Sequence, residues 1–331
     1  MTVSPASSSR AGLAWAALAV VIVAAYPSIT RLGVTQQAMT PMELATLRYA
    51  VAGLVLLPCL RARGLGRRQW GEAAILALCQ GTPLAALIAA GLALAPASHG
   101  AALTLGLMPA VTLLLGLLAG RAPSGMAGLG AAVIAAGAVG LSLQDLGTGG
   151  SALLGHAMFV LAAVMGSTYF IRLRGSGFSA AQGAAFVAVL SGAGGVIALT
   201  LMGDLPHLAR IAPETLAFQA VFQGLLVGVL ASFAMNRAIA LLGPVPATVC
   251  MSLVPVAATV LAIPVLGEVP SPGEAGAVAC MAFGAALPAV APFFAGIAAP
   301  LRAFLANLFR RLPVPARMRR AGPARGDVPA G

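Results

Sequence analysis

Ten runs of roughly 20 mainly apolar residues make up most of this chain, and they restrict its fold more than any other feature. A helix of that length crosses the hydrocarbon core of a bilayer and satisfies its own backbone hydrogen bonds, which lipid cannot do. Charges, prolines and glycine clusters bound the runs, which cover residues 12–31, 41–60, 72–94, 97–119, 125–144, 152–172, 180–202, 215–240, 244–266 and 272–292. The sequence therefore predicts an all-α, polytopic membrane protein with ten transmembrane helices.

The composition of the chain agrees with a surface that faces lipid. Of its 331 residues, 60% are apolar and 8% are charged, whereas a soluble domain carries about 25% charged residues. The net charge of +11 would suggest nucleic-acid binding in a soluble protein. Here the basic residues are arginines in short loops and in the C-terminal tail, which is typical of a membrane protein. No nucleic-acid partner is therefore expected.

The loop charges predict the orientation of the helices. If the N-terminus lies in the cytoplasm, the inward loops carry Arg61, Arg63, Arg67, Arg68, Arg121, Arg172, Arg174 and Arg237. The outward loops then carry Arg31, Asp145, Asp204, Arg210, Glu214, Glu268 and Glu274. Since cytoplasmic loops are enriched in Arg and Lys, this distribution predicts a multi-pass protein of the cell inner (plasma) membrane with both termini in the cytoplasm.

The two ends of the chain need separate interpretations. Arg10 and the apolar run after it also fit a signal peptide, but the run is long enough to span and another span follows at once, which favours a retained first helix after a cytoplasmic segment 1–11. Within 297–331, an amphipathic helix on the cytoplasmic leaflet is expected, where arginines meet anionic lipid. Its apolar face would consist of Leu301, Phe304, Leu305, Leu308 and Leu312. The basic remainder is predicted to be disordered.

Two short turns, GRAPS at 120–124 and GEVPS at 267–271, share the frame Gly-x-x-Pro-Ser. Further matches follow in the same order and pair Pro109 with Pro255, Gly137 with Gly284, and CQG at 79–81 with FQG at 222–224. We interpret the series as a duplication, with repeats over 12–144 and 152–292. Each repeat has five spans, so the second enters the membrane from the opposite side. This is the inverted arrangement of secondary transporters, whose binding site lies between the repeats.

Three segments carry a resemblance to a known family: TPMELATLRYAVAGLVLLP (40–58), GLMPAVTLLLGLLAGRAPSGMAGLGAAVIAAGAVGL (106–141) and SLVPVAATVLAIPVLGEVPSPGEAGAVACMAFGAAL (252–287). They resemble EamA-type members of the drug/metabolite transporter superfamily. The resemblance implies a ten-helix fold that moves small metabolites, often outward. The chain departs from the family pattern at Arg121, where the first repeat usually shows Glu, and in the seventh span, which lacks the Arg of the second span.

Polar residues inside the spans are the candidates for substrate binding, because such groups are costly in lipid. Arg48 lies roughly 10 Å inside the second span and would either recognise an anionic group or tie neighbouring helices together. Gln80 and Gln223 lie midway along the third and eighth spans and would either face a central cavity or join helices by hydrogen bonds. The further candidates for the path are Tyr26, Tyr169 and Asn236, with Tyr49, Ser167, Thr168 and Gln182 beside them. Pro109 and Pro255 are the gating candidates, since a proline in mid-span loosens its helix.

The remaining ionisable residues bear on ion coupling and on metal binding. His99 and His156 lie near the external ends of their spans and are expected to be separate, interfacial histidines, with a proton-handling role as the alternative. No Asp or Glu lies in the central part of a span, which favours facilitated efflux or exchange over coupling through a buried carboxylate. The four cysteines show no C-x-x-C spacing, so neither a metal site nor a cofactor is expected.

The function that fits these features is a secondary transporter that exports small polar metabolites, such as amino acids or related compounds, by alternating access between the repeats. A non-transporting membrane subunit or sensor, a passive channel and a membrane-embedded enzyme are the alternatives. The enzyme would need a motif such as H-E-x-x-H or G-x-S-x-G, and the sequence has neither. The expected partners are the small-molecule substrate and membrane lipids, including anionic lipid at the C-terminal helix, and a homodimer stays open.

Overall fold

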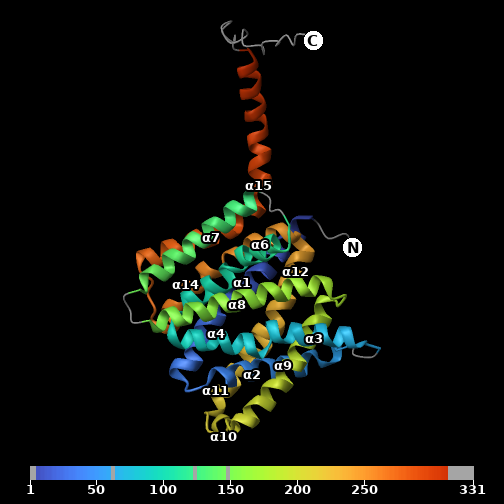
Figure 1. Ribbon diagram of the computed structural model, residues 1–331, viewed down its shortest axis with the longest axis vertical. Coiled ribbons are helices and arrows are strands. Elements are labelled where there is room, and N and C mark those ends of the chain that lie inside the picture. Colours follow the sequence, from blue (N-terminus) through green and yellow to red (C-terminus); the bar gives the residue numbers. More distant parts are fainter. Residues whose placement is uncertain (1–4, 61–63, 122–124, 147–149, 312–331) are drawn as a thin grey trace, which may run out of the picture. The chain divides into compact units, whose positions relative to one another are not determined.

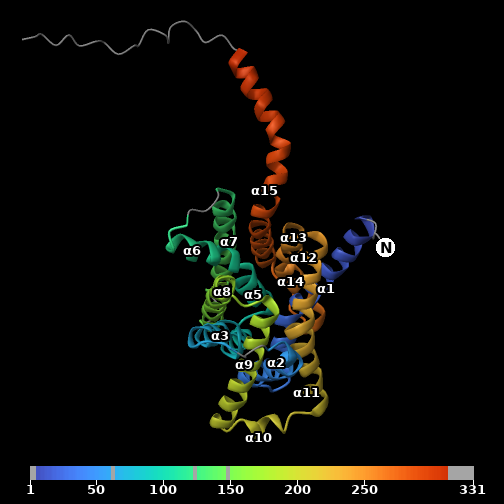
Figure 2. The same ribbon diagram turned by 90° about the vertical axis from the view of Figure 1, so that its right-hand side faces the viewer.

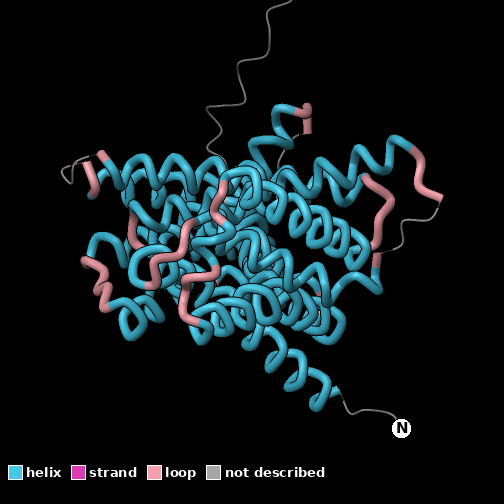
Figure 3. Tube along the Cα trace, turned by 90° about the horizontal axis from the view of Figure 1, so that it is seen from below, coloured by secondary structure: helices cyan, strands magenta, loops and turns pink. Residues whose placement is uncertain are grey.

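The computed structural model describes residues 5–60, 64–121, 125–146 and 150–311, which are almost entirely helical and contain no strand (Figure 3). Ten helical stretches in these ranges are long and apolar enough to cross a membrane. They cover Arg10–Gln36, Pro41–Cys59, Arg67–Leu94, Ala97–Leu118, Gly125–Gln144, Ser151–Gly175, Ala180–Met202, Pro213–Leu242, Val245–Leu266 and Pro272–Ala291. The predicted fold class and the number of spans are confirmed, with boundaries that differ by a few residues.

The first five spans contain seven α-helices. These are α1 (Pro5–Gln36), α2 (Pro41–Leu56), α3 (Arg67–Gln80), α4 (Thr82–Leu94), α5 (Ala97–Ala101), α6 (Met108–Leu118) and α7 (Gly125–Gln144). A 3₁₀ turn η1 (Leu57–Cys59) ends the second span, and a π-helical segment η2 (Ala102–Gly106) joins α5 to α6. The third span is therefore α3 with α4 (Figure 1), and the fourth is α5, η2 and α6.

The second five spans contain α8 (Ser151–Gly175), α9 (Ala180–Met202), α11 (Pro213–Gln219), α12 (Ala231–Leu242), α13 (Pro244–Ser252), α14 (Val254–Leu266) and α15 (Pro272–Arg311). A short helix α10 (Leu205–Leu208) lies in the link after α9, and a π-helix η3 (Ala220–Leu230) joins α11 to α12. Residues up to Ala289 form one compact unit, and Val290 begins a second. Within that second unit, helix α15 continues to Arg311, whereas the predicted tail after it lies outside the described residues.

Three spans are interrupted, and the duplication relates two of the interruptions to one another. The fourth span breaks at Leu107, two residues before Pro109, and the ninth breaks at Leu253, two residues before Pro255. A proline has no N–H to donate to the preceding turn, which explains why a helix restarts at each site. The third span breaks at Gly81, after Gln80. Paired breaks at matched prolines are consistent with two copies of one unit.

The helix contacts also occur in related pairs. Helix α1 of the first span packs against α12 and α14 of the eighth and ninth spans, and α8 of the sixth span packs against α4 and α6 of the third and fourth. Helix α2 packs along α9, and the two lie side by side in both side views (Figures 1 and 2). If the first five spans are exchanged with the second five, the contacts of α1 become those of α8, and the contact between α2 and α9 maps onto itself. The arrangement is consistent with inverted repeats around a pseudo-two-fold axis.

Small residues let α2 and α9 approach closely. A Cβ on Gly192 would lie 2.7 Å from the backbone oxygen of Tyr49, and a Cβ on Gly53 would lie 3.0 Å from that of Ala188. As numbers rise along α2 the facing numbers fall along α9, so the helices are antiparallel. Close backbone approach through glycine is a common way for membrane helices to pack, since lipid supplies no hydrophobic drive between them.

Helices α7 and α15 form the fifth and tenth spans, which the duplication also matches, and they pack in the same way as α2 and α9. A Cβ on Gly130 would lie 2.6 Å from the backbone oxygen of Gly284, and one on Gly137 would lie 2.8 Å from that of Ala277. These helices are also antiparallel. The sequence match pairs Gly137 with Gly284, so the contact is symmetric under exchange of the repeats.

The outer surface of the compact unit is apolar. Large side chains such as Leu54, Leu118 and Leu201 are 74%, 78% and 83% exposed. A soluble protein rarely leaves so many leucines open to water, and lipid is the solvent that removes the cost. Two of the four free cysteines, Cys59 and Cys280, also lie on this surface.

Candidate functional site

Arg48 forms the centre of the candidate site, in the part of α2 that faces α1. Its guanidinium carbon lies 4.8 Å from the centre of the Tyr26 ring and 5.3 Å from that of the Tyr49 ring. Tyr26 comes from α1 and Tyr49 from α2, and both are buried. The faces of aromatic rings attract a cation, so the two tyrosines hold the positive charge in place without neutralising it.

Among the residues that the structure describes, the charge on Arg48 has no acidic partner. No carboxylate in the described parts of the chain lies within ion-pair distance of its guanidinium, and Arg48 Nε is buried without a hydrogen-bond partner. An unpaired charge away from water is costly, and an anionic ligand would remove that cost. The arrangement is therefore suited to a carboxylate, which an Arg side chain can bind with two parallel hydrogen bonds.

Gln80 adds a second unsatisfied polar group near the same tyrosine. The hydroxyl of Tyr49 donates to the backbone oxygen of Gln80, at the break between α3 and α4. The side-chain oxygen of Gln80 is buried without a partner and faces Gly166 of α8, next to Met108. Met108 belongs to the broken fourth span, and its backbone oxygen accepts a hydrogen bond from Ser167 at 3.2 Å. A candidate binding group thus lies beside a break that the repeats share.

Gln223 is placed differently from Gln80, although the sequence pairs them. Its amide nitrogen donates to Thr30 Oγ1 at 3.0 Å and to Gln219 Oε1 at 3.3 Å, and the side chain is buried. Gln219 in turn donates to Gln37 Oε1 at 2.7 Å. These hydrogen bonds join the eighth span to the first. In this conformation Gln223 connects helices, which is the alternative that the sequence left open.

The last two binding candidates, Tyr169 and Asn236, lie in different environments. Tyr169 of α8 is buried in an apolar cluster that also contains Tyr49. Asn236 of α12 is exposed, and within the described residues no hydrogen bond or ring contact joins it to the other candidates. The structure therefore gathers Arg48, Tyr26 and Gln80 around Tyr49, with Tyr169 in the adjoining cluster, and leaves Asn236 apart.

One end of the bundle is closed by polar contacts; we call it the Glu268 end, after the residue in the turn between α14 and α15. Glu268 pairs with Arg31 of α1 and accepts the backbone N–H of Ala97 at 2.9 Å, at the start of the fourth span. Arg31 also donates to the backbone oxygens of Leu92 and Ala95, which end the third span. The GEVPS turn thus ties both repeats together at this end.

The opposite end, which we call the Arg172 end, has a weaker counterpart. There Arg172 donates to Glu72 at 3.2 Å, and its side chain is 48% exposed. Arg121, which the duplication matches with Glu268, is exposed and positively charged, so it cannot accept the contacts that Glu268 accepts. The sequence change between GRAPS and GEVPS therefore removes a contact at one end that exists at the other.

A double-mutant cycle of Arg31→Met with Glu268→Gln is expected to give a coupling free energy of about 1–2 kcal/mol in thermal unfolding, because the pair is partly buried and both side chains also bond to the backbone between the third and fourth spans. The same cycle with Arg172→Met and Glu72→Gln, the matched control, is expected to give less than about 1 kcal/mol, since exposed pairs contribute little. Equal couplings at the two ends would contradict the asymmetry described above.

A histidine cluster at the Glu268 end was not expected from the sequence. His99 Nδ1 and His156 Nε2 lie 2.9 Å apart, and Asp145 Oδ2 is 3.1 Å from each of them. The expectation of two separate interfacial histidines is therefore wrong, because α5 and α8 pack so that both rings turn inward. Because the histidines are 57 positions apart in the sequence, no local spacing could have revealed the contact.

Comparisons with known proteins agree with this architecture. Residues 10–143, from the start of the first span to the end of the fifth, match the EamA-like transporter family. A chain solved by crystallography has the same fold, with a TM-score of 0.56 and 20% sequence identity over 86% of this chain and 97% of that chain. No curated protein sequence matches.

Proposed function

We propose that this chain, whose residues 10–143 match the EamA-like transporter family, is a secondary transporter of the drug/metabolite type that exports small polar metabolites. The substrates we propose carry a carboxylate, as amino acids and related compounds do. The observation that supports this class is the unpaired Arg48 between Tyr26 and Tyr49. Arg48 provides a fixed positive charge inside a bundle of helices whose outer surface faces lipid.

The substrate would meet a second polar group at Gln80. A zwitterion carries hydrogen-bond donors as well as a carboxylate, and the buried side-chain oxygen of Gln80 is an acceptor without a partner. Tyr49 contacts both residues, through its ring to Arg48 and through its hydroxyl to Gln80. We propose that the carboxylate binds at Arg48 and the ammonium or hydroxyl group of the substrate at Gln80.

Alternating access would use the two breaks at Leu107 and Leu253 as bending points. Helices bend most easily where the backbone hydrogen-bond ladder is already interrupted, and Pro109 and Pro255 maintain those interruptions. The contacts of Glu268 with Arg31 and Ala97 close one end in this conformation. Opening would require these contacts to separate while the Arg172 end closes.

The proposed orientation places the Arg172 end in the cytoplasm. Arg67, Arg68, Arg121, Arg172, Arg174 and Arg237 all lie at this end in the structure. Six of the acidic residues lie at the Glu268 end, namely Glu43, Asp145, Asp204, Glu214, Glu268 and Glu274. By the positive-inside rule, we propose that both termini lie in the cytoplasm. The membrane that we propose is the inner (plasma) membrane of the cell.

Counterflow in proteoliposomes tests the proposal directly. Vesicles loaded with an unlabelled mixture of standard L-amino acids and small carboxylates should take up members of the labelled mixture with saturable kinetics, and empty vesicles should not. A passive channel would show no counterflow, and a subunit or sensor would show no uptake at all. Either result would contradict the proposal.

An imposed pH gradient should change the rate of this uptake by less than about twofold. The acid buried in a span is Glu43, and it caps α2 through Thr40 while accepting from His207 Nδ1 at 2.7 Å at the Glu268 end. It does not lie beside Arg48 or Gln80, so proton binding there would not be coupled to the substrate directly. A strong gradient dependence that Glu43→Gln abolishes would overturn this expectation.

A further inference from the structure

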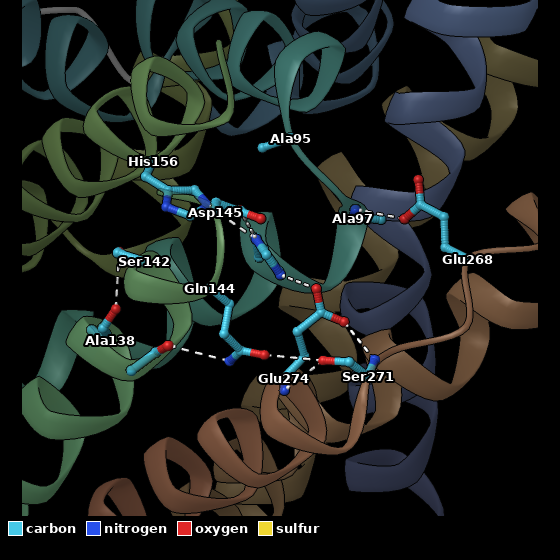
Figure 4. A network of polar contacts seen from close by, with 12 residues as sticks. Ala95, Ala97, Ala138, Ser142, Gln144, Asp145, His156, Glu268, Ser271 and Glu274 are labelled. Atoms are coloured by element: carbon cyan, nitrogen blue, oxygen red, sulfur yellow. Dashed lines mark hydrogen bonds and ion pairs between the residues drawn. The ribbon is translucent and has the colours of Figure 1, made fainter. Parts of the chain in front are cut away.

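Three potential metal-binding atoms converge at the Glu268 end, away from Arg48. They are His99 Nδ1 from α5, His156 Nε2 from α8 and Asp145 Oδ2 from the residue that follows α7. Their mutual separations are 2.9, 3.1 and 3.1 Å. Figure 4 shows the Asp145 and His156 side chains pointing toward one another from separate elements. The cluster is enclosed, with side-chain exposures of 0% for His99, 5% for His156 and 13% for Asp145.

A second carboxylate supports His99 through the ring nitrogen that does not face the cluster. His99 Nε2 lies 3.1 Å from Glu274 Oε1, in the first turn of α15. Glu274 is fixed in turn by Ser271, whose backbone N–H donates to its other oxygen at 2.7 Å and whose hydroxyl accepts from its N–H at 3.2 Å. Gln144 Oε1 accepts a hydrogen bond from Ser271 at 3.0 Å, which joins the end of α7 to this group (Figure 4). A carboxylate behind a ligating histidine is the usual support of a metal site.

One neutral tautomer of His99 favours a cation as the occupant of this cluster. If His99 donates its Nε2 hydrogen to Glu274, its Nδ1 carries a lone pair that faces Asp145 and His156. A carboxylate oxygen and that lone pair then oppose each other across 3.1 Å, with at most one proton from His156 between them. One metal ion accepts all three lone pairs at once and removes this conflict.

We propose that His99, Asp145 and His156 bind one divalent transition-metal ion, with Zn²⁺ the best match. Two imidazoles and a carboxylate are the donors of many three-ligand zinc sites, and Zn²⁺ binds them at about 2.0–2.2 Å. An ion at that distance from all three atoms lies about 1 Å outside their plane, so the existing tripod needs only small side-chain movements. The end of α7 adds favourable partial negative charge from its last carbonyl groups.

The site would clamp the Glu268 end. Its ligands join the fourth span, the link between the fifth and sixth spans, and the sixth span, while Glu274 adds the tenth. Bound metal would therefore stabilise the conformation in which this end is closed. This consequence depends on the proposed transport function, whereas binding of the ion does not.

Isothermal titration of the full-length, purified chain with Zn²⁺ tests the site. The protein should carry no polyhistidine tag and should first be treated with a chelator. We expect one ion per chain, with binding lost in His156→Ala and in Asp145→Asn. Glu274→Gln should weaken binding about 10–100-fold, since it removes support and not a ligand. His207→Ala is the matched control at the same end and should bind as the wild type does.

Cobalt spectroscopy guards against a variant that fails to fold. His156→Cys keeps a ligand at the same place, and bound Co²⁺ should then show a thiolate charge-transfer band that the wild type lacks. Failure of the wild type to bind Zn²⁺, equal binding by His156→Ala and His207→Ala, or no such band in His156→Cys would each overturn the site. External Zn²⁺ should slow counterflow by the wild type and not by His156→Ala, and an unaffected rate would overturn the clamp. Absence of counterflow with intact Zn²⁺ binding would count against the transport proposal alone.

Discussion

Replacing Arg48 by methionine is expected to lower the rate of carboxylate uptake about 10–100-fold, the loss of one charge-assisted interaction with the substrate. Methionine keeps most of the apolar stem between Tyr26 and Tyr49 but removes the charge and all the donors. Arg48→Lys should keep part of the activity, since it retains the charge without the planar fork. The measurement is counterflow with the labelled mixture of amino acids and carboxylates.

The thermal stability of Arg48→Met separates a binding role from a structural one. If Arg48 serves the substrate, the unliganded variant should unfold at the same or a higher temperature, because an unpaired charge has been removed. If Arg48 ties helices together, the variant should lose stability and uptake alike. Arg174→Met is the control: it removes an exposed arginine at the Arg172 end and should change neither property. Full uptake by Arg48→Met would refute the proposed binding site.

Gly192→Val is expected to prevent folding or to lower the free energy of unfolding by at least about 3 kcal/mol, the upper range for overpacking. Even the first carbon of the side chain, Cβ, would lie 2.7 Å from the backbone oxygen of Tyr49 and 3.0 Å from the Cα of Ala50. Backbone atoms cannot rotate away as a side chain can, so α2 and α9 would have to separate.

Gly194→Val provides a closely matched control on the same helix. A Cβ on Gly194 meets nothing within 4 Å, and the residue is exposed. Both variants change helix propensity equally, so the difference between them reports packing alone. Size-exclusion profiles and melting temperatures in detergent are the measurements. Melting temperatures within about 2 °C of each other would show that α2 and α9 do not pack as described.

The spans and their number could be predicted because length and hydropathy are local properties of the chain. Segments such as 125–144 and 180–202 agree with the structure to the residue, since no water-exposed alternative exists for them. The breaks near Pro109 and Pro255 also follow from the sequence, because a missing N–H acts within one turn. The split of the third span at Gly81 could not be predicted, since a glycine within an apolar run keeps its N–H and does not have to interrupt a helix.

The candidate site was only partly accessible to sequence reasoning. Arg48 and Gln80 were identified by the cost of polar groups in lipid, and the structure places both in contact with Tyr49. Gln223 was expected to match Gln80, but the hydroxyl of Thr30 on α1 lies within reach of its amide. Which partner a polar group finds depends on the facing helix, and periodicity within one span does not contain that information.

By itself, the sequence determined that this chain is a ten-span helical membrane protein with one arginine deep in a span, and it predicted a duplicated five-span pattern. Tertiary structure alone decided that Glu268 ties α1 to the fourth span and that His99 and His156 meet Asp145. It also gave Arg48 two ring neighbours and, among the described residues, no acid. The physical reason is that hydropathy acts residue by residue along the chain. Hydrogen bonds, ion pairs and metal ligands require atoms from different helices within about 3 Å, and only packing brings them there.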